Sequence, residues 1–273
     1  MSKTSNFLDF YLDSSIHVAL AVLSLTFVTY TTLDITINND VLVFVFFGTI
    51  SAYNYIKFGI PFKPFRKGGV NYATFITFFS IISLLVSTYH FIYLNKSIWL
   101  CGFLIALLIG GYMWPITKNG QNLRSLGIVK VLLVALVWTM TTMLIPVLQA
   151  EITIVSWDLW LLLLQQIILV LILLIPFEIR DLNFDEPNLK TIPQRIGVQK
   201  TKLMGGFLVF IYYNSLFLRD TLLQDELLQK GFISLLLLFV LLITKQKQSP
   251  YFAAFYVEGI PILWALAIII FIN

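Results

Sequence analysis

Nine long runs of apolar residues divide this chain, and they constrain its fold more than any other feature. The runs cover approximately residues 15–33, 41–57, 72–94, 98–114, 127–149, 155–177, 203–218, 228–244 and 251–272. A helix needs roughly 20 mostly apolar residues to cross the hydrocarbon core of a bilayer. The runs are continuous and do not alternate with polar residues, so they predict helices rather than barrel strands. We therefore expect an all-α membrane protein with nine transmembrane helices in a single domain, residues 1–273.

The composition excludes a separate aqueous domain. Apolar residues make up 59% of the chain and charged residues only 12%, whereas a soluble domain carries roughly a quarter charged residues. The longest stretch between predicted spans, 178–202, is too short for an independent fold. The eighth span has a short apolar core, so we expect Leu227 and a snorkelling Lys230 to extend it. Function must then reside in the membrane or in the short loops.

The distribution of basic residues predicts the orientation of the nine spans. Three lie on one side, namely Lys96, Arg219 and Lys230, and the other fifteen lie on the side of the N-terminus. Basic residues gather in cytoplasmic loops, so we expect a cytoplasmic N-terminus and an outside C-terminus in a cell's plasma membrane. The loops account for the net charge of +4 without a nucleic-acid partner, and no obligatory protein partner is evident.

The loop between the sixth and seventh spans gathers the polar side chains with the clearest chemistry. Asp181 and Asp185 are spaced i, i+4, so on a continued helix they lie on one face and repel unless a cation sits between them. Mg²⁺ prefers oxygen ligands and is often held by one or two carboxylates together with substrate phosphates. Arg180, Lys190 and Arg195 supply cations for a diphosphate. Spacing alone favours a solvated loop over a metal site, because such a pair of aspartates is common in polar loops.

The run IRDLNFDEPNLKTIPQRIG resembles the second aspartate-rich motif of the UbiA superfamily of intramembrane prenyltransferases, typically RDxxxDxxxGxxTLPxxxG. Six residues fall on its fixed positions: Arg180, Asp181, Asp185, Thr191, Pro193 and Gly197. The spacing from Asp185 to Thr191 is one residue shorter than usual. The resemblance implies a nine-helix bundle whose central cavity opens to the cytoplasm and laterally to lipid. It also implies that Asp181 and Asp185 are catalytic and bind magnesium.

The first aspartate-rich motif of that family, NDxxDxxxD, is not present in full. The second span ends in GTISAYNYIKFGIPFKPFRKGG, where Asn54 aligns with the motif asparagine and the carboxylates are absent. Cations can neutralise a diphosphate that fewer metals contact, and Lys57, Lys63, Arg66 and Lys67 lie on the required side. Tyr53 and Asn54 are candidates to hydrogen-bond a phosphate or a metal-bound water. An equally plausible interpretation is an interfacial aromatic and an interhelical hydrogen bond.

Two further ionisable residues are candidates inside the membrane. Glu258 lies about two turns into the last span, where an ionisable group is a functional candidate facing the bundle interior, and the pair of Glu258 and Gly259 resembles the start of the last helix in the same family. Lys130, near the start of the fifth span, either snorkels to the interface or reaches into the cavity as a diphosphate ligand.

These features favour an enzyme, a UbiA-like prenyltransferase. It would use Mg²⁺ to ionise an isoprenyl diphosphate and transfer the prenyl group to a lipophilic acceptor. A terpene cyclase or diphosphate lyase that needs no acceptor is the first alternative. A noncatalytic protein that binds or moves isoprenoid lipids is the second.

Overall fold

The computed structural model describes residues 7–59, 69–114, 122–152, 156–186 and 189–272. Helices make up 83% of the structure, and the described residues contain no strand. The all-α class predicted from the continuous apolar runs is therefore confirmed. In chain order the helices are α1 (Phe7–Asp13), α2 (Ile16–Thr32), α3 (Asn39–Phe58), α4 (Gly69–Ile92), α5 (Lys96–Met113), α6 (Ile128–Thr139), α7 (Ile145–Gln149), α8 (Trp157–Asp181), α9 (Ile192–Asn214), α10 (Gln224–Ile243) and α11 (Ile260–Ile272). Shorter turns are the 3₁₀ segments η1 (Leu123–Ser125) and η4 (Ser215–Leu218) and the π-helical segments η2 (Met140–Leu144) and η5 (Phe252–Val257).

Eight helical segments among the described residues are long and apolar enough to cross a membrane. The chain is therefore a multi-pass integral membrane protein. The first predicted span corresponds to α2, which is bent by 60° against the short α1, so a ninth crossing requires these two helices to count as one broken span. Ser15 lies at the bend with φ 63°, a left-handed conformation that interrupts the helix.

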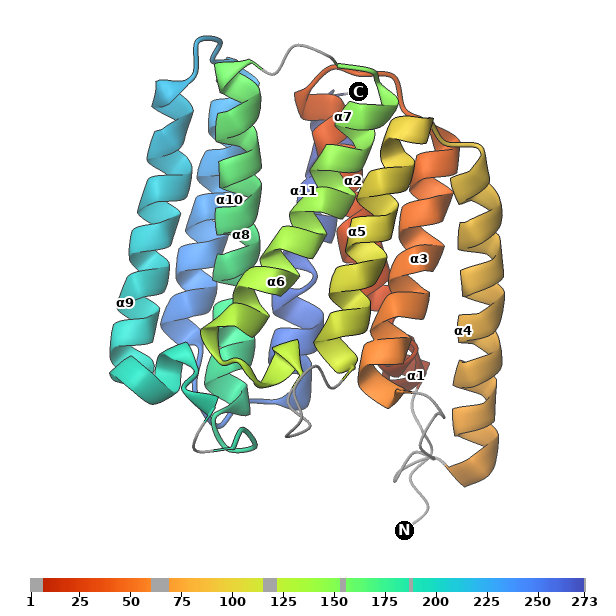
Figure 1. Cartoon of the computed structure of the whole chain (residues 1–273). Helices are drawn as coiled ribbons and strands as arrows, with labels where there is room; N and C mark the ends of the chain where they lie inside the picture. The colour runs from red at the N-terminus through yellow and green to blue at the C-terminus, as the bar shows by residue number, and fades with distance from the viewer. Residues whose placement is uncertain (1–6, 60–68, 115–121, 153–155, 187–188, 273) are drawn as a thin grey trace.

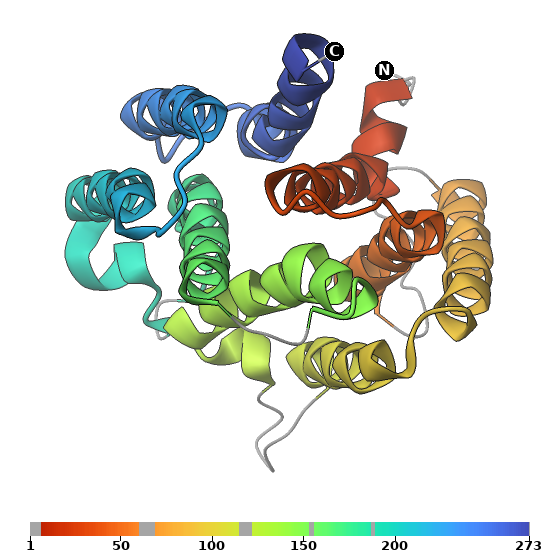
Figure 2. The ribbon, with the colours of Figure 1, turned by 90° about the horizontal axis from the view of Figure 1, so that it is seen from above.

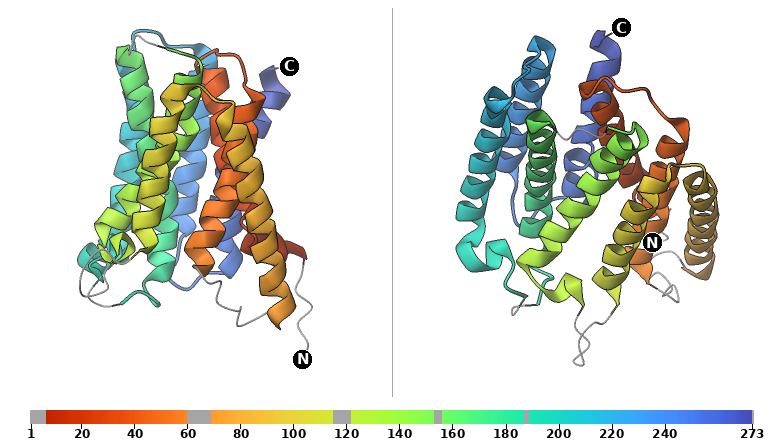
Figure 3. Two further views of the ribbon diagram at one scale, coloured as in Figure 1. Left: turned by 45° about the vertical axis from the view of Figure 1, so that its right-hand side comes forward. Right: turned by 45° about the horizontal axis from the view of Figure 1, so that its top comes forward.

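The helices form a ring in which most elements pack against their neighbours in sequence (Figures 1 and 2). α2 packs against α3 and against α11, so the first long helix and the last helix lie side by side and close the ring. α8 packs against α6 and α9, and α10 packs against α9. α4 packs chiefly on α3 and stands at the rim of the bundle (Figure 3).

The outer face of the bundle is apolar, as expected for a surface in contact with lipid. Large exposed hydrophobic side chains line the outside of four helices: Phe78 and Leu85 on α4, Leu100 and Phe103 on α5, Leu203 and Phe210 on α9, and Leu235 and Leu242 on α10. A monomeric soluble protein rarely exposes apolar patches of this extent.

Lys230 differs from the expectation for the eighth span. The residue is only 3% exposed and forms an ion pair with Glu226 at 2.7 Å instead of snorkelling to water. The span reaches membrane length because α10 begins at Gln224, within the preceding polar stretch.

Candidate functional site

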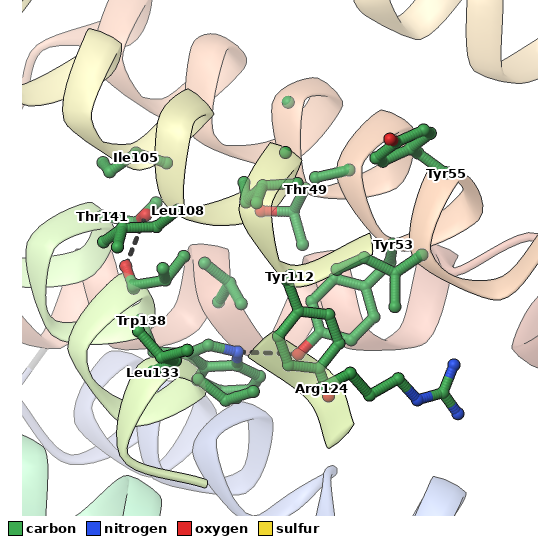
Figure 4. A pocket seen from close by; sticks show the side chains of 18 of the residues that line it. Thr49, Tyr53, Tyr55, Ile105, Leu108, Tyr112, Arg124, Leu133, Trp138 and Thr141 are labelled. Carbon is green, nitrogen blue, oxygen red and sulfur yellow. Dashed lines mark hydrogen bonds between the residues drawn. The ribbon is translucent and has the colours of Figure 1, made fainter. Parts of the chain in front are cut away.

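A cavity of about 1180 Å³ lies within the bundle and is lined chiefly by α3, α4, α5, α6 and α8. Most of its walls are apolar or aromatic (Figure 4). Except for Glu258, its charged residues come from the lower ends of α6 and α8 in Figure 1, together with the segments that adjoin them. Three lining residues, Ile81, Leu84 and Phe103, are also at least half exposed on the bundle surface. The cavity thus combines one ionic end with a long apolar interior.

The C-terminal end of α8 provides the carboxylates of the ionic end. The helix ends at Asp181, but the backbone N–H of Asp185 still donates to the carbonyl oxygen of Asp181 at 2.8 Å. This single additional turn places Asp185 one turn beyond Asp181 without a continued helix. Both residues line the cavity, as does Glu178 one turn earlier.

Two cations neutralise part of this acidic cluster. The Nζ of Lys130, from α6, lies 2.9 Å from Oε1 of Glu178 and 3.2 Å from Oδ2 of Asp185. The guanidinium of Arg180 donates to both carboxylate oxygens of Asp181, at 2.7 and 3.2 Å. Three carboxylates therefore face two cations, which leaves an excess of one negative charge at the end of the cavity.

Glu178 is a member of this cluster that the motif comparison did not select. Its side chain is 10% exposed, and its Oε2 atom is buried without a hydrogen-bond partner among the described residues. The signal was present in the sequence, because Glu178 precedes Asp181 by three residues and Asp185 by seven, which is one face of a helix. Glu178 was not selected because it directly follows an apolar run and precedes the first residue of the motif, Arg180.

Tyr53, Tyr112 and Trp138 form an aromatic part of the cavity wall (Figure 4). The indole Nε1 of Trp138 donates to the hydroxyl of Tyr53 at 2.7 Å, which ties α3 to α6. Tyr112 and Arg124 line the same region, and the Arg124 side chain extends past the Tyr112 ring in Figure 4. Arg124 is a basic lining residue that the sequence analysis did not select as a site residue.

Asn54 lies outside the cavity lining and is fully buried. Its Oδ1 accepts from Ser15 at 2.7 Å, and its Nδ2 donates to the Ser14 carbonyl oxygen at 3.2 Å and to the Ser80 hydroxyl at 2.8 Å. This geometry corresponds to the interhelical interpretation, because the amide joins α3 to α4 and to the bend between α1 and α2.

The remaining predicted cations are placed differently from Lys130. Lys57 donates to the Leu12 carbonyl oxygen at 2.9 Å and does not line the cavity. Lys190 and Arg195 are exposed, and Arg195 Nε donates to the Lys190 carbonyl oxygen at 2.8 Å. Neither belongs to the lining residues. The predicted cations Lys63, Arg66 and Lys67 lie outside the described residues.

Glu258 also lines the cavity and follows the π-helical segment η5, which packs against α8. Segments of this kind often occur at functional sites. The extra residue per turn leaves the Phe255 carbonyl oxygen close to the His17 Nε2 atom, at 2.9 Å. Lys57 and Arg180 are the cations that act on Glu258 electrostatically.

The motif residues that follow Asp185 shape the loop and the start of α9. Thr191 is the N-cap residue of α9, and its backbone N–H donates to the Gln194 side chain at 3.1 Å. Pro193 occupies the first turn, where its missing N–H is tolerated. Gly197 has φ 80° at a kink within α9, a conformation that favours glycine.

Gly127 holds this loop against α6, and its substitution gives a testable prediction. Its φ is 55°, and an added Cβ would lie 2.3 Å from the Leu189 carbonyl oxygen. We expect Gly127→Ala to lower the stability by about 1–3 kcal/mol through strain and displacement of the loop. Thermal unfolding in detergent measures the loss. Gly206→Ala is the matched control, because its Cβ would meet only Leu238 at 4.0 Å; equal melting temperatures for the two variants would contradict the prediction.

The acidic cluster supplies carboxylate oxygens, which are the type of ligand that Mg²⁺ prefers. No group of three or more histidine, cysteine, aspartate or glutamate residues in the described part of the chain is arranged to hold a metal by itself. Mg²⁺ commonly uses one or two carboxylates and completes its coordination with water and substrate. The excess negative charge and the unpartnered Oε2 of Glu178 suit such a shared site.

Comparison with protein-family models, with curated proteins and with solved structures finds no match to this chain.

Proposed function

We propose that this protein is a UbiA-like intramembrane prenyltransferase, which transfers the prenyl group of an isoprenyl diphosphate to a lipophilic acceptor. The observation that carries the proposal is the position of Asp181 and Asp185 at the ionic end of a large apolar cavity. A diphosphate head and an isoprenoid tail require these two environments side by side. The motif resemblance around the two aspartates supplies the reaction class.

The arrangement of charge supports a cytoplasmic position for this ionic end. The lower end of the bundle in Figure 1 holds one end each of α3, α6, α8 and α9, and these ends, with the described residues that adjoin them, carry most of the described basic residues. The opposite end holds Lys96, Arg219 and the buried Lys230. Under the positive-inside rule this distribution supports a cytoplasmic position for the carboxylates, with the N-terminus inside and the C-terminus outside, in the proposed plasma membrane. The nine-span bundle of the family requires α1 and α2 to act as one crossing.

Each part of the cavity has a role in this proposal. Asp181 and Asp185 would hold magnesium, which when bound neutralises the diphosphate and promotes its departure. Lys130 and Arg180 lie within the same cluster and would bind diphosphate oxygens. The tail would lie along the apolar walls, where burial contributes about 0.8 kcal/mol per methylene.

The surface position of part of the lining gives the tail a route to the bilayer. Ile81, Leu84 and Phe103 line the cavity and are exposed on α4 and α5. An opening between these helices would let a long isoprenoid extend sideways into lipid. The apolar walls also keep water away from an allylic cation.

Release of pyrophosphate tests the proposal directly. We expect purified protein to release pyrophosphate from farnesyl or geranylgeranyl diphosphate only when magnesium is added. Release that requires a lipophilic acceptor supports transfer, whereas release without any acceptor identifies a cyclase or lyase. Retained binding of these diphosphates with no release at any chain length would contradict an enzymatic function and favour a noncatalytic lipid-binding protein.

A further inference from the structure

Lys130 occupies a position between two carboxylates that a metal ion would otherwise suit. Its ammonium group contacts Glu178 at 2.9 Å and Asp185 at 3.2 Å, and all three side chains are at least four-fifths buried. An ammonium group has three donors, so these contacts leave one donor for another acceptor. The ammonium therefore bridges two carboxylates but balances only one of their two negative charges, and one of its three donors has no part in these contacts.

Glu178 provides independent evidence for a ligand at this position. Its Oε2 atom is buried and has no hydrogen-bond partner among the described residues, although the residue lines the cavity. A buried carboxylate oxygen without a partner is costly, and it is tolerated where the oxygen serves a bound group. Asp181 differs from Glu178 in this respect, because both of its carboxylate oxygens accept hydrogen bonds from Arg180.

We propose that Glu178 and Asp185 form a divalent-cation site that Lys130 closes when no anionic ligand is present. A diphosphate would draw the Lys130 ammonium away from the carboxylates, and a metal ion would take its place between them. This inference deepens the proposed function and rests on it for the identity of the anion. The inference adds Glu178 to Asp181 and Asp185 as a third functional carboxylate. The chain lacks the carboxylates of the first aspartate-rich motif.

Metal binding without any prenyl substrate tests the site. Mn²⁺ is a suitable probe because it favours oxygen ligands and its free concentration is measured by electron paramagnetic resonance. Wild-type protein should bind Mn²⁺ weakly, and Lys130→Met should raise the affinity about tenfold or more, because the competing cation is gone. Lys130→Arg keeps the charge and should show no gain. Lys190→Met removes an exposed lysine outside the cavity and is the matched control.

The role of Glu178 is tested by combining substitutions. Lys130→Met together with Glu178→Gln should lose the gain in affinity, whereas Lys130→Met together with Lys190→Met should keep it. The first of these double variants removes both partners of a buried pair, so it avoids the unpaired charge that can prevent folding of Lys130→Met alone. An unchanged affinity in Lys130→Met, or a gain that survives Glu178→Gln, would overturn the proposal.

Inorganic pyrophosphate tests the closing role of Lys130 in the unmodified protein. Adding it to the wild type should increase bound Mn²⁺ beyond the amount that pyrophosphate alone holds in solution, and Glu178→Gln should remove this increase. The same amount in wild type and Glu178→Gln would overturn the inference. This measurement uses no prenyl diphosphate. A Glu178-dependent increase here, combined with no release of pyrophosphate in the prenyl diphosphate assay, would support the cation site and reject only the proposed reaction.

Discussion

Asp181→Asn and Asp185→Asn are each expected to lower magnesium-dependent release of pyrophosphate by at least about 100-fold. Groups that stabilise developing charge in a reaction typically contribute this much or more. An amide retains the size of the carboxylate but supplies one neutral oxygen, so it binds a divalent cation far more weakly. Release of pyrophosphate from geranylgeranyl diphosphate under saturating magnesium measures the effect.

The geometry allows these two variants to be compared without a large folding defect. Asp181→Asn frees Arg180, whose side chain is 29% exposed and can be solvated. Asp185→Asn leaves Lys130 paired with Glu178 at 2.9 Å. Neither substitution therefore leaves a buried cation alone, and melting temperatures should stay close to that of the wild type.

Glu151→Gln is the control for activity, because this carboxylate lies at the opposite end of the bundle near Asn95. It should release pyrophosphate at the wild-type rate. Wild-type rates in both aspartate variants would refute the metal site on Asp181 and Asp185. Equal losses in the aspartate variants and in Glu151→Gln would indicate a general effect on the fold.

The helical spans could be predicted from the sequence because membrane thickness fixes their length. The predicted run 41–57 corresponds to α3 (Asn39–Phe58), and the run 98–114 corresponds to α5 (Lys96–Met113). The predicted run 203–218 begins eleven residues after the start of α9. Residues 192–202 are polar, and their helical conformation depends on the cap at Thr191 and on packing against the preceding loop. The bend at Ser15 depends on a left-handed backbone conformation that apolar periodicity does not encode.

The candidate site was predictable only where it is local in sequence. Asp181 and Asp185 are four residues apart, so their placement on one cavity wall follows from helix geometry. The contact between Lys130 and Asp185 joins residues 55 apart in the chain and requires the packing of α6 on α8. Asn54 matched a motif position, but packing of α3 against α4 directs its amide to Ser80 instead of to the cavity.

A second ionic cluster, at the other end of the bundle, gives the largest expected effect on stability. Glu226 pairs with Arg219 and with Lys230, whose side chains are 6% and 4% exposed. Lys230 also donates to Gln165, and Gln165 donates to Ser215 at 2.9 Å. The cluster thus joins α10 to α8 and to η4 through side chains that are all buried.

Glu226→Gln is expected to lower the free energy of unfolding by about 3–5 kcal/mol, because it leaves two buried cations with less compensation. Asp158 is the other carboxylate near Arg219, at 3.6 Å, and it does not replace the contact with Lys230. For a chain of this size the loss corresponds to a decrease in melting temperature of roughly 10 °C, which thermal unfolding in detergent measures.

Removing the opposing charge should restore much of this loss. In Glu226→Gln combined with Lys230→Met, Arg219 keeps Asp158 and no second cation remains buried, so the double variant should be more stable than Glu226→Gln alone. Asp225→Asn is the matched control: it removes an exposed carboxylate one residue earlier in the first turn of α10 and should change the stability by at most about 1 kcal/mol. A double variant no more stable than the single one would mean that Lys230 stabilises α10 through its contact with Gln165, and that the ion pair with Glu226 contributes little.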